Sequence, residues 1–226
     1  MDKRITYKVV IDTETCPLVN SNEVRPENMF AYDIGYAITD KRGKVYLTRS
    51  FVNADIFLYE RNLMNSAYYA DKIPTYWEDI KNGKRVLARL STILKIFYED
   101  CKTYGVTEFY AHNMRFDYGA LNNTIRWVTK SDRRYFFPYG AEICDTLKMA
   151  RDILGGKKSY IRFCKDNDYL TGNGRPRFTA EIIYRFITGD NEFIESHTGL
   201  EDVMIEKEIL AYCYRQHKAM RRKLWE

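Results

Sequence analysis

The 226-residue sequence contains no apolar run that approaches the ~20 residues of a membrane span. Its first residues, MDKRITY, also lack the apolar stretch of a secretory signal peptide. The five cysteines are scattered and form no CxxC pair, which argues against a disulfide scaffold and against a thiolate zinc site. Internal repeats and low-complexity tracts are absent as well. We therefore expect one cytoplasmic globular domain over residues 1–226, with no membrane partner.

The charge balance is mildly basic, with 36 Lys and Arg against 31 Asp and Glu, a net charge of +5. Such an excess suits a polyanionic partner. Basic residues cluster over 130–134, 157–165 and 175–177, and aromatic residues interleave several of these clusters. The 19 Tyr and 12 Phe are explained either by core packing or by base stacking, and composition leaves both explanations open.

Apolar, β-branched residues dominate three early segments, Ile5–Ile11, Phe30–Thr39 and Lys44–Val52. The turn residues 40–43 join the last two, so the chain is predicted to open as an antiparallel meander. Later segments alternate between helices, over 85–104, 116–129, 146–153, 159–167, 179–188 and 200–216, and strands, over 107–111 and 140–144. Because helices connect them, these two strands should run parallel to the first. The fold class is therefore α/β, with a mixed sheet flanked by helices.

Two carboxylates, Asp12 and Glu14, follow the first strand and share one face because strand side chains alternate. Neighbouring like charges beside a core are costly unless something pairs with them, and a divalent cation is a suitable partner. The alternative is that the strand has already left the core and that both side chains are solvated. The apolar run before Asp12 argues against that alternative.

Two further pieces carry acidic residues. Asp117 follows the strand over 107–111 and lies at the start of a helix, where it could also serve only the helix dipole. Asp202 begins the last helix, with His197 five residues earlier. If the three segments converge in the fold, their four carboxylates repel one another and need a metal ion to be stable. Hard oxygen ligands of this kind suit Mg²⁺ or Mn²⁺. Two such ions would clamp a phosphodiester, with His197 as the general base.

The motifs Ile11–Thr15 (IDTET), Ala111–Asp117 (AHNMRFD) and His197–Asp202 (HTGLED) occur in the order found in the DEDDh exonuclease family, which the sequence resembles from residue 5 to about 215. The resemblance implies a ribonuclease H-like fold and a pair of divalent cations. It matches Asp12, Glu14, Asp117 and Asp202 to metal ligands and His197 to the general base. It also places four residues near the terminal nucleotide: Thr13, Thr15, Asn113 and Phe116. The stretches 53–85 and 155–178 exceed a minimal family member and are expected as insertions.

The function implied is a metal-dependent 3′–5′ exonuclease that releases nucleoside monophosphates from single-stranded ends. We favour DNA over RNA because the family includes proofreading subunits, and a polymerase or replication protein is then a candidate partner in trans. One alternative is a 3′–5′ exoribonuclease. Another is a non-catalytic nucleic-acid-binding or polymerase-associated module with the same fold.

Overall fold

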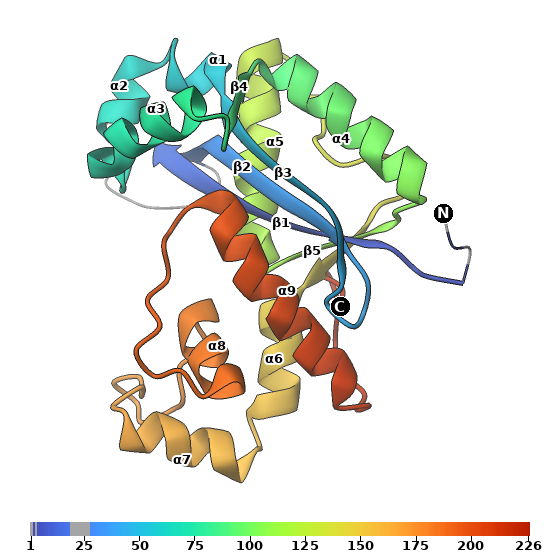
Figure 1. Ribbon diagram of the computed structural model, residues 1–226, viewed down its shortest axis with the longest axis vertical. Helices are drawn as coiled ribbons and strands as arrows, with labels where there is room; N and C mark the ends of the chain where they lie inside the picture. Colours follow the sequence, from blue (N-terminus) through green and yellow to red (C-terminus); the bar gives the residue numbers. More distant parts are fainter. Residues whose placement is uncertain (1, 3, 19–27) are drawn as a thin grey trace.

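A mixed sheet forms the centre of the computed structural model, which describes residues 2, 4–18 and 28–226 (Figure 1). Within these residues the sheet has six strands in the order β4-β3-β2-β1-β5-β6. Their bounds are β1 Lys8–Pro17, β2 Met29–Thr39, β3 Val45–Asn53, β4 Val86–Ala88, β5 Glu108–Ala111 and β6 Glu142–Asp145. Strands β1 to β3 form the predicted antiparallel meander, and β5 and β6 continue it in parallel, as expected. The ribonuclease H-like α/β class is confirmed.

Strands β1 and β4 differ most from the sequence prediction. Strand β1 begins at Lys8 and continues six residues past Ile11, to Pro17, because β2 pairs with it along its whole length. Asp12 and Glu14 therefore lie within the sheet and not beyond it. Strand β4 was predicted as the first turn of a helix, but residues 86–88 pair in parallel with β3 at the sheet edge. Helix α4 begins only at Leu90.

Helices cover both faces of the sheet (Figure 1). Helices α4 (Leu90–Tyr104) and α5 (Met114–Thr129) pack on the face that carries Val9 and Ile11. The opposite face, with Val10, packs against α9 (Gly199–Arg215) and α6 (Thr146–Leu154). Helices α7 (Lys158–Asp166) and α8 (Ala180–Thr188) extend this second layer. The alternation of β1 side chains thus assigns Asp12 and Glu14 to the α9 face.

The stretch 53–85 forms short helices, as predicted: α1 Ala54–Phe57, α2 Arg61–Asn65, the 3₁₀ helix η2 Ala70–Lys72 and α3 Ile73–Lys81. They bury a separate apolar cluster against the ends of β2 and β3, around Tyr32, Val52 and Tyr76. All five cysteines are buried and unpaired. None of the helices in the described part of the chain is long and apolar enough to cross a bilayer.

Candidate active site

Strand β1 and the starts of α5 and α9 together line one acidic pocket of about 580 Å³. Strand β1 supplies Asp12 and Glu14, the start of α5 supplies Asp117, and the start of α9 supplies Asp202. The segment before α9 adds His197. The structure therefore brings together all five positions that the sequence motifs singled out.

Three of these carboxylates lie close enough to share a metal ion. Asp12, Glu14 and Asp202 each offer an oxygen, and these oxygens all lie within 4.8 Å of one another. Burial, and then the charge of Asp202, raise the pKa of Glu14 to about 9. Burial, and then the charge of Glu195, raise the pKa of Asp202 to about 8. The pKa of Asp12 lies well above its usual range, through burial and then the charge of Asp117. Without a cation, this cluster opposes its own ionisation.

Asp117 is held beside the cluster by β1. The backbone N–H of Thr13 donates to its Oδ1 at 3.1 Å, and the Thr13 hydroxyl donates to the same oxygen at 2.8 Å. Burial still raises the pKa of Asp117 to about 7, although these hydrogen bonds lower it. Thr13 therefore orients a carboxylate, which leaves that oxygen fixed relative to Asp12 on the adjoining residue.

A fifth carboxylate, Glu206, was not predicted as part of the site. It lies one helical turn after Asp202, lines the same pocket and is only 3% exposed. Burial, followed by the charge of Asp117, raises its pKa well above the usual range. The i+4 spacing from Asp202 was visible in the sequence, but that spacing alone did not show which helix face is buried.

The oxygen atoms of this cluster fit a divalent cation. Among the described residues, Asp202 Oδ1 and Glu206 Oε2 are buried and have no hydrogen-bond partner. A buried carboxylate oxygen without a donor is costly unless it is protonated or faces a cation. The donors are hard oxygens, the type that Mg²⁺ and Mn²⁺ prefer. The residues present therefore match the chemistry of the ions that the sequence implied.

A buried ion pair positions the start of α9. Arg85 Nη1 donates to Asp33 Oδ2 at 3.1 Å, and its Nη2 donates to Glu201 at 2.8 Å. Both Arg85 and Asp33 are almost completely buried. The Arg85 guanidinium thus joins β2 to the first turn of α9, one residue before Asp202. Removing one partner from such a buried network would leave an uncompensated buried charge, which is strongly destabilising.

His197 lies at the mouth of the pocket, stacked on an aromatic ring. Its ring centroid is 4.8 Å from that of Tyr69, at an interplanar angle of 14°. Lys72 Nζ donates to the backbone oxygens of Ser196 and His197, at 2.5 and 3.2 Å. Burial, and then the charge of Lys72, lower the pKa of His197. Tyr69 and Lys72 come from the stretch 53–85, so this stretch supports the His197 segment.

The four residues predicted near the terminal nucleotide occupy different positions. Asn113 and Phe116 line the pocket at the start of α5, where Asn113 adopts a left-handed conformation and its N–H donates to Asp145. Thr13 also lines the pocket, with its hydroxyl directed to Asp117. Thr15 is buried in β1 and is not among the residues that line the pocket. Contact of these four with a nucleotide stays a prediction.

The stretch 155–178 also lines the pocket. Its residues Arg177 and Phe178 line the pocket beside Arg151 of α6. His112 Nε2 lies 2.7 Å from the backbone oxygen of Phe178, which ties this wall to the end of β5. His112 itself was not among the predicted site residues, yet it lines the pocket. Both stretches expected as insertions thus contribute residues to the lining of the acidic pocket.

No protein-family model and no curated protein matches this sequence. Solved structures do match. The nuclease domain of 3′hExo, a DEDDh family member solved with rAMP, superposes with a TM-score of 0.61 at 11% identity, covering 99% of this chain and 100% of that one.

Two further structures agree. A full-length 3′-exonuclease gives a TM-score of 0.60 at 10% identity, covering 96% of this chain and 85% of that one. E. coli exonuclease I with a dT13 oligonucleotide gives 0.55 at 13% identity, and 94% of this chain matches 41% of that one. The chain therefore has the fold of the DEDDh exonucleases, over nearly its whole length.

Proposed function

We propose that this chain is a metal-dependent 3′–5′ exonuclease that releases nucleoside monophosphates from single-stranded nucleic acid. The observation that carries the proposal is the convergence of Asp12, Glu14, Asp117 and Asp202 with His197 in one pocket of this fold. The acidic cluster would serve no evident purpose in a module that only binds a polyanion, because its carboxylates repel phosphate. This favours the enzyme over the non-catalytic alternative.

In this proposal, Asp12, Glu14, Asp117 and Asp202 hold two divalent cations, Mg²⁺ or Mn²⁺. When bound, these ions supply charge neutralisation at the scissile phosphate and make a water molecule more acidic. The protein residues place the substrate and accept the proton. His197 is the general base, and its lowered pKa keeps the imidazole neutral and able to take a proton near neutral pH. The stack on Tyr69 fixes the orientation of the ring.

Aromatic and basic residues around the pocket suit a terminal nucleotide. Phe116 of α5 and Phe178 of the stretch 155–178 both line the pocket and offer rings for base stacking. Arg151 and Arg177 lie at the rim with exposed side chains. They can neutralise phosphates of the departing or incoming nucleotide. Asn113, which is exposed at the start of α5, can bond to the sugar or base.

DNA is the substrate that we propose first, on the resemblance to proofreading enzymes. RNA is the second candidate because the 3′hExo nuclease domain, which matches 99% of this chain, was solved with rAMP. A replication protein in trans stays a prediction. Discrimination between the sugars depends on contacts to the 2′-hydroxyl.

The test is a gel assay on 5′-labelled single strands of DNA and RNA with the same sequence, in Mg²⁺, Mn²⁺ or EDTA. We expect a ladder that shortens from the 3′ end only when metal is present, and the faster substrate identifies the sugar preference. Asp202→Asn is the matched control and should leave the substrate intact. Intact substrate with the wild-type protein in every metal, together with a shifted band in a native gel, would support a binding module instead.

A further inference from the structure

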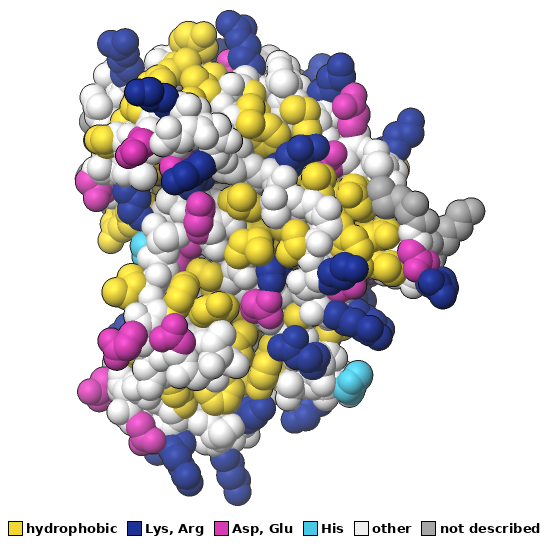
Figure 2. Space-filling model, in the orientation of Figure 1, with side chains coloured by type: hydrophobic (Ala, Val, Ile, Leu, Met, Phe, Trp, Pro, Cys, Tyr) yellow, Lys and Arg dark blue, Asp and Glu magenta, His cyan; other side chains and the backbone are white. Residues whose placement is uncertain are grey.

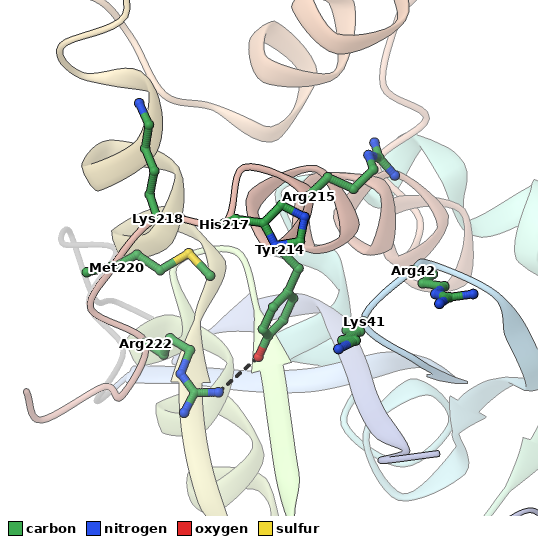
Figure 3. A pocket seen from close by; sticks show the side chains of 9 residues that line it. Lys41, Arg42, Tyr214, Arg215, His217, Lys218, Met220 and Arg222 are labelled. Carbon is green, nitrogen blue, oxygen red and sulfur yellow. Dashed lines mark hydrogen bonds between the residues drawn. The ribbon is translucent and has the colours of Figure 1, made fainter. Parts of the chain in front are cut away.

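A second cavity, of about 570 Å³, lies at the other end of α9 from Asp202. Three segments surround it: the β2–β3 turn, the last turn of α9 and the segment that follows α9 (Figure 3). Five Lys and Arg residues line it, and no Asp or Glu does: Lys41, Arg42, Arg215, Lys218 and Arg222. Figure 2 shows Lys and Arg side chains gathered over this end of α9 and the neighbouring hairpin.

Most of this positive charge is not neutralised within the described part of the protein. Lys41, Arg42, Arg215 and Lys218 are exposed, and no ion pair joins any of them to a described carboxylate. Arg222 is the exception, since it lies 3.6 Å from Glu108 and 3.7 Å from Glu142. Four uncompensated cations around one hollow produce a local positive potential that attracts anions.

The floor of the cavity is fixed by hydrogen bonds. Arg222 Nη1 donates to the Tyr214 hydroxyl at 2.9 Å (Figure 3), and this hydroxyl lies 2.8 Å from that of Tyr110 in β5. The Lys8 ammonium lies 5.4 Å from the Tyr214 ring centroid. A neighbouring cavity shares Lys41, Arg42, Tyr214 and Arg222, but Asp2, Asp40 and Glu108 also line it. The neighbouring cavity therefore mixes cations with carboxylates, whereas the charged residues that line the first cavity are all cationic.

We propose that this basic cavity binds phosphate groups of a nucleic-acid strand whose 3′ end occupies the acidic pocket. Lys and Arg neutralise phosphates and release counterions, and the planar fork of Arg42 or Arg215 can hold one phosphate with two hydrogen bonds. The inference uses the proposed function only to identify the polyanion as nucleic acid. Because the cations surround a hollow and come from three segments, the cavity fits a discrete phosphate group better than it fits a flat anionic surface.

The spacing along α9 sets the length of strand that can reach both sites. Arg215 follows Asp202 by thirteen residues on one helix, which at 1.5 Å per residue is a separation of about 20 Å. Stacked nucleotides advance roughly 3.4 Å each, so a strand needs about six nucleotides to cover this distance. A stacked strand of about three nucleotides spans only about 10 Å, so it can fill the acidic pocket without contacting the basic cavity.

The experiment measures binding in EDTA, where no cleavage occurs, by fluorescence anisotropy of labelled single strands of about 20 and about 3 nucleotides. Two double variants remove the charges, Lys41→Ala/Arg42→Ala and Arg215→Ala/Lys218→Ala. The matched control is Lys95→Ala/Lys102→Ala, which removes two exposed cations from α4. All six side chains are exposed, so the variants should melt at the wild-type temperature, and a melt verifies this.

We expect each cavity variant to bind the long strand roughly 5- to 20-fold more weakly at low salt. The slope of log affinity against log salt should decrease in magnitude by about 1.4, since each lost phosphate contact contributes about 0.7 for single strands. The control should bind like wild type, and the short strand should bind equally to all variants.

The inference is overturned if the cavity variants bind the long strand like wild type, or if the control variant loses as much affinity as they do. An equal loss for the short strand overturns it as well. Inorganic phosphate is the alternative ligand: if it perturbs the amide signal of Lys218 while both cavity variants bind the long strand like wild type, the cavity binds small anions and the proposal is refuted. Since no metal is present, a chain that fails the cleavage assay can still pass this test, so the two proposals fail separately.

Discussion

The backbone N–H of Gly199 donates a 3.0 Å hydrogen bond to Asp33, a carboxylate with no exposed surface in strand β2. The same oxygen accepts from the Tyr76 hydroxyl at 2.7 Å and from Arg85 at 3.1 Å. Asp33 also pairs across the sheet with Glu14 of β1. One buried carboxylate thus fixes the first turn of α9 against β2, the strand that pairs with Asp12 and Glu14 of β1.

The close approach of α9 to β2 depends on a glycine in each element. A Cβ on Gly35 would lie 2.2 Å from the backbone nitrogen of Leu200, so Gly35→Ala must push α9 away from the sheet. We expect a loss of about 1–3 kcal/mol in the free energy of unfolding and a larger proportional loss of cleavage, because Asp202 moves with the helix. Urea unfolding and the gel assay measure both. Gly156→Ala, where a Cβ meets nothing within 4 Å, is the control. Equal behaviour of the two variants would contradict this account of the α9 contact.

Removing one carboxylate from the cluster should abolish activity without unfolding the protein. We expect Asp12→Asn and Asp202→Asn each to lose more than roughly 100-fold in cleavage rate, since even outer residues of metal sites cost about 10- to 100-fold. Their melting temperatures in EDTA should equal or exceed that of wild type, because a buried like charge is removed. The exposed Asp166→Asn serves as control. Global unfolding of either site variant in EDTA would remove that residue from the proposed site.

Lys72 should hold the pKa of His197 down. Its ammonium lies against the backbone of His197, and its charge lowers that pKa in addition to burial. Lys72→Met should therefore raise the pKa of His197. Because a general base works only when deprotonated, the acidic limb of the rate profile should then shift to higher pH. NMR titration of the ring protons, with three histidines in the chain and His197→Gln for assignment, measures the shift directly.

The control for this experiment is Lys72→Arg, which keeps the positive charge and should leave the titration close to wild type. If His197 titrates at the same pH in Lys72→Met as in wild type, then the cation does not tune the base. The role of Lys72 would then be limited to bonding the backbone before α9.

Sequence patterns predicted the antiparallel meander, the two later parallel strands and the five motif positions because all of these depend on local features. A buried strand that ends in acidic residues, or a helix that begins with one, is visible in a short window. Strand β4 was missed because Val86 and Leu87 continue the apolar spacing of α4, and only pairing with β3 makes them a strand. The extension of β1 was missed for a related reason: polar residues 12–15 remain in the sheet because β2 pairs with them.

The supporting parts of the site were beyond sequence reasoning. Tyr69 and Lys72 come from a stretch that matches no motif, and only the folded chain places them against His197. Asp33 and Arg85 are far apart in sequence and become partners through the sheet edge. Glu206 shows the limit most clearly, because a helical Glu is usually solvated and its burial depends on how α9 packs.

Glu206 provides the sharpest test of how the pocket meets a cation. Its Oε2 is buried without a hydrogen-bond partner, and burial together with the charge of Asp117 raises its pKa well above the usual range. Glu206→Gln removes that charge, so the melting temperature in EDTA should hold or rise. The increase in melting temperature on adding Mn²⁺ should be smaller than in wild type, because one fewer anion attracts the ion. For scale, an ion present at 100 times its Kd stabilises a folded protein by about 2.7 kcal/mol. Glu208→Gln, which removes a half-buried partner of Lys207 and does not line the acidic pocket, should leave the gain on adding Mn²⁺ unchanged. A lower melting temperature in EDTA with an undiminished Mn²⁺ gain would make Glu206 a packing residue with no part in holding the ion.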